Sequence, residues 1–132
     1  MAVFYVTPSG NVRGVFWRST SKPRWKEDKI TGWKEDSIAR VDSDIKAISF
    51  DEGQFDLVWV GPDCSLRAAT VYPETESTNG KRPMRAYTIS GSGTVSAGSP
   101  LGIFKFPGHR AFGVLYVDRD GTLTLGYCTN PV

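Results

Sequence analysis

The sequence predicts an all-β fold built of antiparallel, four-stranded repeats that are arranged like propeller blades. Three hairpin-like segments recur along the chain, and Tyr5, Trp59 and Tyr116 occupy the same position in each, at offsets of 54 and 57 residues. An apolar strand ahead of the hairpin also recurs, so a repeat holds about four strands, the number found in a propeller blade. A β-sandwich or barrel of about ten strands is the alternative arrangement.

The composition is that of a single folded domain covering residues 1–132. Hydrophobic residues make up 39% of the chain and aromatic residues 12%, which is enough to form a core. No apolar run approaches the roughly 20 residues of a membrane-spanning helix. The net charge of +2 comes from interleaved charges, so we do not expect a nucleic-acid partner. The first residues, MAVFYVTPSG, lack the features of a signal peptide, which predicts a cytoplasmic protein unless it is released by a non-classical route.

The three predicted hairpins cover residues 3–17, 57–72 and 112–128. In each, a run of apolar residues leads through a four-residue turn, TPSG, GPDC or DRDG, into a second strand. In the last turn, Gly121 supplies the positive φ that a tight turn needs, and the side chain of Asp118 or Asp120 can bond the turn backbone.

The segments between the hairpins complete the repeats. Ser43–Phe50 and Ser99–Phe106 match each other at an offset of 56 residues, and each is predicted to form an apolar strand ahead of a hairpin. Outer strands are predicted near Trp25–Ile30 and over residues 85–89. Polar or glycine-rich connections are expected at residues 33–38, 74–82 and 90–98.

The two cysteines are expected to be unpaired thiols. Cys64 falls in a predicted turn and Cys128 near the end of a strand, so nothing in the repeat brings them together. Two cysteines in a chain of 132 residues do not form a disulfide framework. Reduced thiols agree with the predicted cytoplasmic location.

The repeat resembles that of the fungal fucose-binding lectins, a family of six-bladed propellers. Ala2–Trp17, AVFYVTPSGNVRGVFW, is similar to the middle pair of strands of a blade. Trp33–Ile38 and Ser43–Ile48 are similar to the passage from an outer strand to the inner strand of the next blade. The resemblance implies a propeller that binds sugars.

The resemblance does not extend to the fucose ligands of that family, which are an arginine on the second strand and a glutamate on the third. The positions of the glutamate hold Gly14, Ala68 and Leu125, and the positions of the arginine hold Ala2, Asp56 and Gly113. We therefore expect a sugar other than fucose.

A sugar site needs an aromatic face for the apolar side of the ring and charged or amide groups for the hydroxyls. The aromatic and charged residues near the polar segments are the candidates: Arg13, Trp17, Trp25, Trp33, Arg67, Tyr72, Glu74 and Tyr87. The alternative for each aromatic residue is packing between sheets. For Trp59 and Tyr116, which hold equivalent apolar positions, core packing is the prediction.

No enzyme, metal or cofactor site is predicted. His109 is the only histidine. Its spacing from Cys64 and from the serines does not indicate a nucleophilic catalytic site. Asp118–Gly121 resembles half of a calcium loop, but the further ligands are missing, which favours a plain turn.

Two classes of function therefore stay open. The first is a lectin that binds glycans or glycoproteins, and the second is a protein-binding or inhibitory module that presents loops such as residues 74–82. We also expect a homo-oligomer, most simply a dimer, because the first and last repeats lack a strand and leave sheet edges open.

Overall fold

The computed structural model describes residues 2–17, 25–29, 38–50, 54–72, 84–108 and 110–129. These residues form ten β-strands and no helix. In particular, the described segments contain no helix of the length and apolar character that crossing a membrane requires. The strands are β1 (Ala2–Val6), β2 (Val12–Trp17), β3 (Trp25–Lys29), β4 (Ile45–Ile48), β5 (Phe55–Val60), β6 (Leu66–Val71), β7 (Met84–Ser90), β8 (Gly102–Lys105), β9 (Ala111–Val117) and β10 (Leu123–Thr129).

The strands form three antiparallel sheets with the orders β1-β2-β3, β4-β5-β6-β7 and β8-β9-β10. The predicted all-β, antiparallel class is confirmed. Four strands occur only in the middle sheet, whereas the first and third sheets contain three strands each within the described residues. Over this part of the chain, the sheets close into neither a barrel nor a ring.

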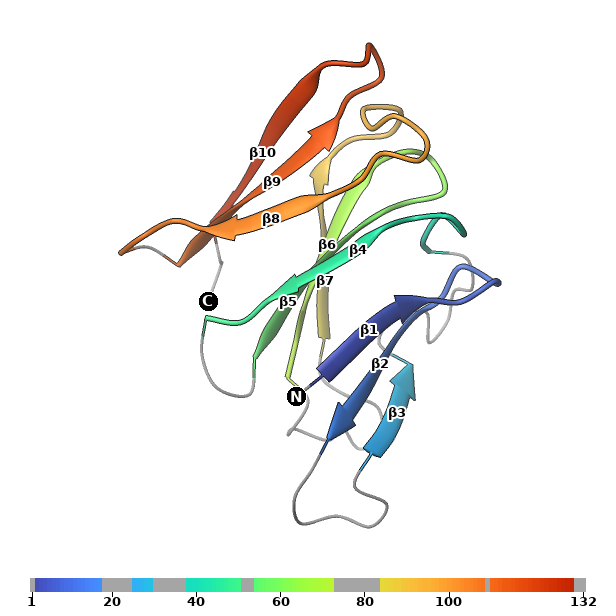
Figure 1. Cartoon of the computed structure of the whole chain (residues 1–132), viewed down its shortest axis with the longest axis vertical. Coiled ribbons are helices and arrows are strands. Elements are labelled where there is room, and N and C mark those ends of the chain that lie inside the picture. The colour runs from blue at the N-terminus through green and yellow to red at the C-terminus, as the bar shows by residue number, and fades with distance from the viewer. Residues whose placement is uncertain are drawn as a thin grey trace.

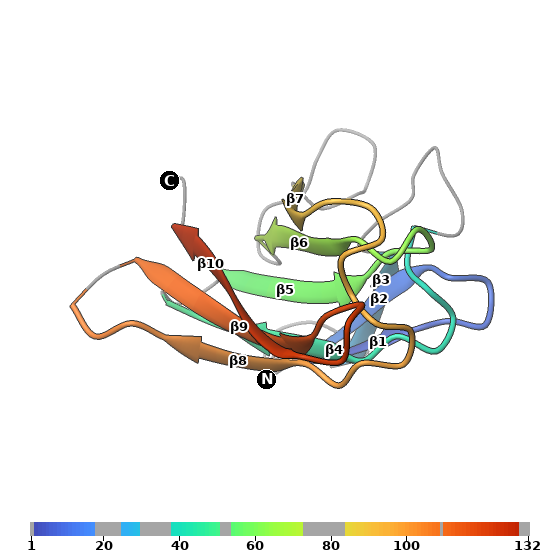
Figure 2. The same ribbon diagram turned by 90° about the horizontal axis from the view of Figure 1, so that it is seen from above.

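The three sheets are arranged like a fan. Figure 1 shows the first sheet in blue, the middle sheet in green to yellow and the third sheet in orange to red, in that order across the molecule. Strand β4 of the middle sheet contacts β1 on one side and β8 on the other. From this line of contact, the middle sheet extends outward through β5 and β6 to β7 (Figure 2).

The three hairpins have nearly the bounds predicted from the sequence. Strands β1 and β2, β5 and β6, and β9 and β10 pair antiparallel over all or nearly all of their lengths. The apolar strands predicted within residues 43–50 and 99–106 are present at residues 45–48 and 102–105. The outer strands predicted near residues 25–30 and over residues 85–89 are present at residues 25–29 and 84–90. Trp59 and Tyr116 are buried, with 1% and 6% of their surfaces exposed, as predicted.

Apolar residues fill both spaces between the sheets. The core between the first and middle sheets is formed by Val12, Ala39, Leu57, Trp59, Ala69 and Val71. The core between the middle and third sheets is formed by Val58, Val60, Leu66, Ala68, Val95, Leu101, Phe112, Val114 and Tyr116. Alternate residues of β5 and β6 therefore face two different cores, as the two-residue period of a strand requires.

The three hairpin turns share one backbone structure. In each, the N–H of the first residue donates to the carbonyl of the fifth, and the N–H of the fourth donates to the carbonyl of the first, at 2.8–3.0 Å. The fourth residue has a positive φ in all three turns, 79° at Gly10, 58° at Cys64 and 82° at Gly121. The predicted role of Gly121 is confirmed, and Cys64 holds a conformation that L side chains rarely adopt.

Both cysteines are free, as the sequence predicted. Cys64 lies in the turn between β5 and β6, whereas Cys128 lies on β10 of the third sheet. Neither thiol is fully exposed.

The equivalent turn positions predict opposite effects on stability. Gly121→Ala should lower the free energy of unfolding by about 1 kcal/mol, because a side chain at positive φ is strained. A Cβ there would meet no atom within 4 Å, so backbone strain is the main cause. Cys64→Gly should raise the free energy of unfolding by up to about 1 kcal/mol, because it relieves the same strain. Urea unfolding of both variants and the parent measures the two differences. A loss of stability in both variants would contradict the shared turn conformation.

Candidate functional site

A serine hydroxyl fixes the start of the middle and third sheets. Ser43 Oγ accepts a hydrogen bond from the N–H of Val60, and Ser99 Oγ accepts one from the N–H of Val117, both at 2.8 Å. Each hydroxyl also donates to the carbonyl of the residue after it, at 2.6 Å for Ser43 and 2.8 Å for Ser99. The same anchor therefore occurs twice, one repeat apart.

The segment ahead of each serine joins two consecutive sheets at their turns. One N–H of this segment donates to the turn of the preceding sheet, and the next N–H donates to the sheet that follows, at 2.8–2.9 Å. The four bonds run from Ala39 to Gly10, from Arg40 to Val60, from Val95 to Cys64 and from Ser96 to Val117. These junctions bring side chains of two sheets and one connecting segment to a common rim.

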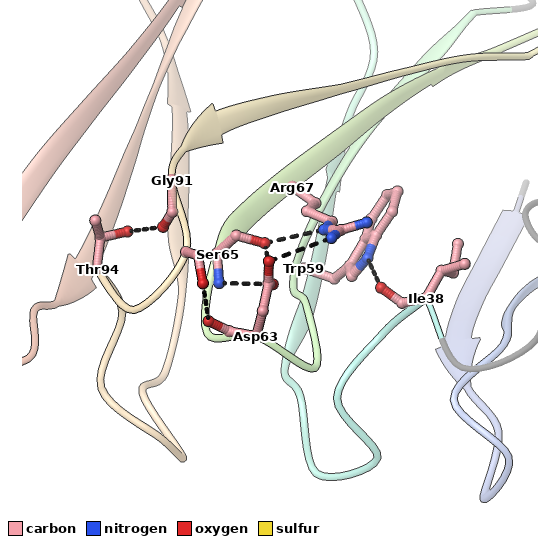
Figure 3. A network of polar contacts seen from close by, with 8 residues as sticks. Ile38, Trp59, Asp63, Ser65, Arg67, Gly91 and Thr94 are labelled. Carbon is pink, nitrogen blue, oxygen red and sulfur yellow. Dashed lines mark hydrogen bonds and ion pairs between the residues drawn. The ribbon is translucent and has the colours of Figure 1, made fainter.

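Side chains fill the first junction. The indole Nε1 of Trp59 donates to the carbonyl of Ile38 at 3.2 Å, which ties β5 to the connecting segment (Figure 3). Beside it, Arg67 Nε donates to Ser65 Oγ at 2.9 Å, and Ser65 Oγ donates to Asp63 Oδ1 at 2.6 Å. Arg67 Nη2 also lies 3.5 Å from Asp63 Oδ2.

This network also explains why Gly61 begins the turn. A Cβ at Gly61 would lie 2.7 Å from Arg67 Nε and 2.7 Å from Ser65 Oγ, closer than real contacts allow. The first junction thus has no room for a longer side chain at this position.

The second junction is open. At the positions of Trp59, Arg67 and Gly61, it holds the different residues Tyr116, Thr124 and Asp118. A shallow pocket of about 280 Å³ lies there. It is lined by Ser90, Thr94, Tyr116, Asp118, Arg119, Asp120 and Thr124. The side chain of Thr124 is much shorter than that of Arg67, so the space that Arg67 occupies in the first junction is left open in the second.

The pocket combines one aromatic ring with charged and hydroxyl groups. Asp118 Oδ1 accepts hydrogen bonds from the N–H groups of Asp120 and Thr122, both at 2.9 Å, and Asp118 Oδ2 accepts one from the Thr124 hydroxyl at 3.1 Å. These bonds, the one from Thr122 first, hold the pKa of Asp118 below its ordinary value. Asp118 is therefore a carboxylate at neutral pH. The predicted bond from an aspartate to the turn backbone is confirmed for Asp118.

The opposite wall of the pocket belongs to the loop after β7. The Ser90 hydroxyl donates to Thr94 Oγ1 at 2.8 Å, and the Thr94 hydroxyl donates to the carbonyl of Gly91 at 2.7 Å. The N–H of Arg119 donates to the carbonyl of Thr94 at 3.2 Å and joins the two walls. Arg119 and Asp120 are themselves exposed, so their charges lie at the mouth of the pocket.

The structure separates the site residues predicted from the sequence. Arg67 lies in the filled first junction, and Tyr72, which is half-buried, follows the opposite end of β6. Arg13 lies on β2, where the backbone register places Trp17 opposite Trp25 of β3. Trp33 and Glu74 lie outside the described residues.

Tyr87 packs against the core between the middle and third sheets. Its buried hydroxyl lies near Thr70 and Cys128 but makes no hydrogen bond of good geometry within the described part of the chain. Burial raises the pKa of Tyr87 and that of Cys128. This location agrees with packing between sheets, the alternative stated for each aromatic candidate.

A fully buried carboxylate lies in the same layer. Asp56 of β5 accepts a hydrogen bond from the Thr70 hydroxyl at 2.6 Å and one from Gln54 Nε2 at 3.2 Å. Desolvation nevertheless raises the pKa of Asp56 above its ordinary value. The ionised carboxylate of Asp56 therefore lowers the stability of the folded chain at neutral pH. Its hydrogen bonds with Thr70 and Gln54 account for its position in the core.

The residues of the open pocket are not among the site residues predicted from the sequence. The sequence predicts Asp118–Gly121 only as a turn and Tyr116 only as a core residue. The available signal was the difference between aligned repeats, with Thr124 where the preceding repeat has Arg67 and Asp118 where it has Gly61.

Comparisons with protein-family models, curated proteins and solved structures found no match for this chain. Within the described residues, no three histidine, cysteine, aspartate or glutamate side chains gather in a group that could hold a metal ion. The polar groups that line the pocket are carboxylates, a guanidinium and hydroxyls.

The buried carboxylate predicts an unusual pH dependence of stability. Because the pKa of Asp56 is raised on folding, its contribution to stability is present below the unfolded pKa of about 3.9 and is lost as the pH rises through the folded pKa. Relative to the parent, Asp56→Asn should therefore be more stable at pH 7 than at pH 4.5. Urea unfolding of both proteins at the two pH values measures this difference. The subtraction removes the opposite effect of aspartates whose pKa is lowered, such as Asp118.

A difference between parent and variant that stays constant from pH 4.5 to pH 7 would contradict the raised pKa. Asp42→Asn is a control for the loss of a carboxylate, because Asp42 is exposed and its pair with Arg40, at 2.8 Å, is an exposed one; this variant should change the free energy of unfolding at pH 7 by less than about 1 kcal/mol.

Proposed function

We propose that this chain is a carbohydrate-binding protein that holds a sugar in the open pocket between its middle and third sheets. The pocket itself carries the proposal, because it brings a tyrosine ring, two aspartates, an arginine and three hydroxyl groups to one shallow site. Sugar hydroxyls bind to such charged and hydroxyl groups, and the small exposed part of Tyr116, 6% of its surface, offers an apolar contact beside them.

The size of the pocket favours a small ligand. Its volume of about 280 Å³ lies just below the 300–1,000 Å³ that is usual for sites of drug-sized molecules. One sugar unit at the end of a glycan suits this volume better than a longer oligosaccharide. Since the pocket is open to solvent, we expect weak binding at each site and useful avidity only when several sites act together.

The order of the sheets supports a propeller-like arrangement as the scaffold of this site. Three sheets follow one another at nearly constant offsets, their innermost strands lie side by side, and the same serine anchor joins the repeats. Consecutive blades of a propeller are related in this way. In this proposal, the sugar site is a junction between two blades.

The sequence indicates a second candidate position at the first sheet. It consists of Arg13, Trp17 and Trp25 on that sheet and Trp33 in the following segment. Variants can distinguish it from the open pocket. The alternative function, a protein-binding or inhibitory module, corresponds to the absence of any glycan binding.

The test is binding of the fluorescently labelled protein to a glycan array, with free monosaccharides as competitors. Arg119→Ala should weaken binding at least tenfold, about 1.4 kcal/mol, because a charged hydrogen-bond donor at the mouth of the pocket is lost. Lys105→Ala is the matched control, since Lys105 is an exposed cation on β8 that does not line the pocket. It should bind like the parent.

Three results would count against the proposal. If the parent binds no glycan, the chain is not a lectin, and the protein-binding alternative gains support. If Arg119→Ala binds like the parent while Trp25→Ala or Trp33→Ala does not, the site lies at the first sheet. If Lys105→Ala loses as much binding as Arg119→Ala, a general effect of charge explains the loss.

A further inference from the structure

The outward face of the third sheet is apolar and exposed. Side chains that alternate along β10 lie on this face, with exposed fractions of 69% for Leu123, 51% for Leu125 and 57% for Tyr127. Leu115 of β9 and Phe104 of β8 extend the patch, with exposed fractions of 38% and 37%. We call these five residues the third-sheet face. A contiguous apolar patch of this kind is unusual on a protein surface unless a partner covers it.

The repeat shows what covers the equivalent face inside the chain. Leu115, Leu123 and Leu125 lie 57 residues after Val58, Leu66 and Ala68. Those three residues of the middle sheet are fully buried in the core that the third sheet closes. The third-sheet face therefore corresponds to a surface on which this chain already packs a further sheet.

The outward side of the first sheet also carries an exposed apolar residue. Val3 on β1 has 54% of its surface exposed, and Val12 on the paired strand β2 is fully buried against the middle sheet. Val3 and Tyr5 lie 54 residues before Leu57 and Trp59, and these two are buried in the core between the first and middle sheets. The outward side of β1 thus corresponds to the face of the middle sheet that packs against the first sheet.

We propose that copies of this chain associate head to tail, with the third-sheet face of one copy packed on the outward side of the first sheet of the next. The contact would repeat, between two chains, the sheet-on-sheet packing that each chain already contains twice. It joins two different surfaces and is therefore heterologous, unlike the two-fold contact of most homodimers. The sugar site plays no part in this inference, so the two proposals can fail separately.

Two charge substitutions at opposite ends of the molecule test the proposal by sedimentation velocity at micromolar concentration. Leu125→Asp places a carboxylate on the third-sheet face, and Val3→Asp places one on the outward side of the first sheet. Both positions are at least half exposed, so the isolated chain should tolerate them. The parent should be an oligomer and each variant alone a monomer. An equimolar mixture of the two should form a 1:1 dimer, because each variant keeps the surface that the other lacks.

The controls separate association from folding. Thr88→Asp changes an exposed position on β7, at the outer edge of the middle sheet, and should assemble like the parent. Circular dichroism and the unfolding midpoint of each variant show whether it folds. Should Leu125→Asp fail to fold, Leu123→Asp replaces it, because Leu123 is the most exposed residue of the same face.

A monomeric parent would overturn the proposal. Self-association of Val3→Asp at the level of the parent, together with a monomeric Leu125→Asp, would show that two third-sheet faces pack on each other. A mixture of the two variants that stays monomeric would also overturn the head-to-tail contact.

Discussion

Both faces of the middle sheet are excluded from water along β5 and β6, and the arrangement of the other two sheets depends on this. Leu57, Val58, Trp59 and Val60 follow one another along β5 with at most 1% of their surfaces exposed. Successive residues of a strand point to opposite faces, so a continuous apolar run is stable only between two covering layers. The first sheet supplies one layer and the third sheet the other. Each of these outer sheets is then left with one face covered within the chain.

Much of this fold could be predicted from the sequence because its signals are local and occur more than once. Gly10 and Gly121 indicated the turns, the alternation of apolar residues indicated the strands, and the constant offsets identified the repeat. The apolar strands at residues 45–48 and 102–105 could be found for the same reason, since the segments that contain them begin at Ser43 and Ser99 and match each other at an offset of 56 residues. The position of Cys64 in the turn was also predicted, but its positive φ was not, because a cysteine gives no signal for that conformation.

The candidate site was harder to predict because it depends on a difference between two equivalent junctions. Long side chains fill the first junction, and shorter ones leave the second open. The connecting segments are held largely through backbone N–H and carbonyl groups, and such bonds can be made by almost any residue. The pocket lies where Tyr116 and Thr124 replace a tryptophan and an arginine. A search for aromatic and charged residues selects Arg67, which fills its junction, and Tyr87, which packs between sheets.

The serine anchors have a consequence for how a chain of this kind can change in length. Residues 43–98 begin at one anchor and end directly before the next, and the sheet within them is covered on both sides by its neighbours. A tandem duplication of this segment within the reading frame would therefore carry its own anchor and both contact surfaces. Chains of different length could in this way arise from one gene by unequal recombination, each with one more junction whose side chains are free to diverge.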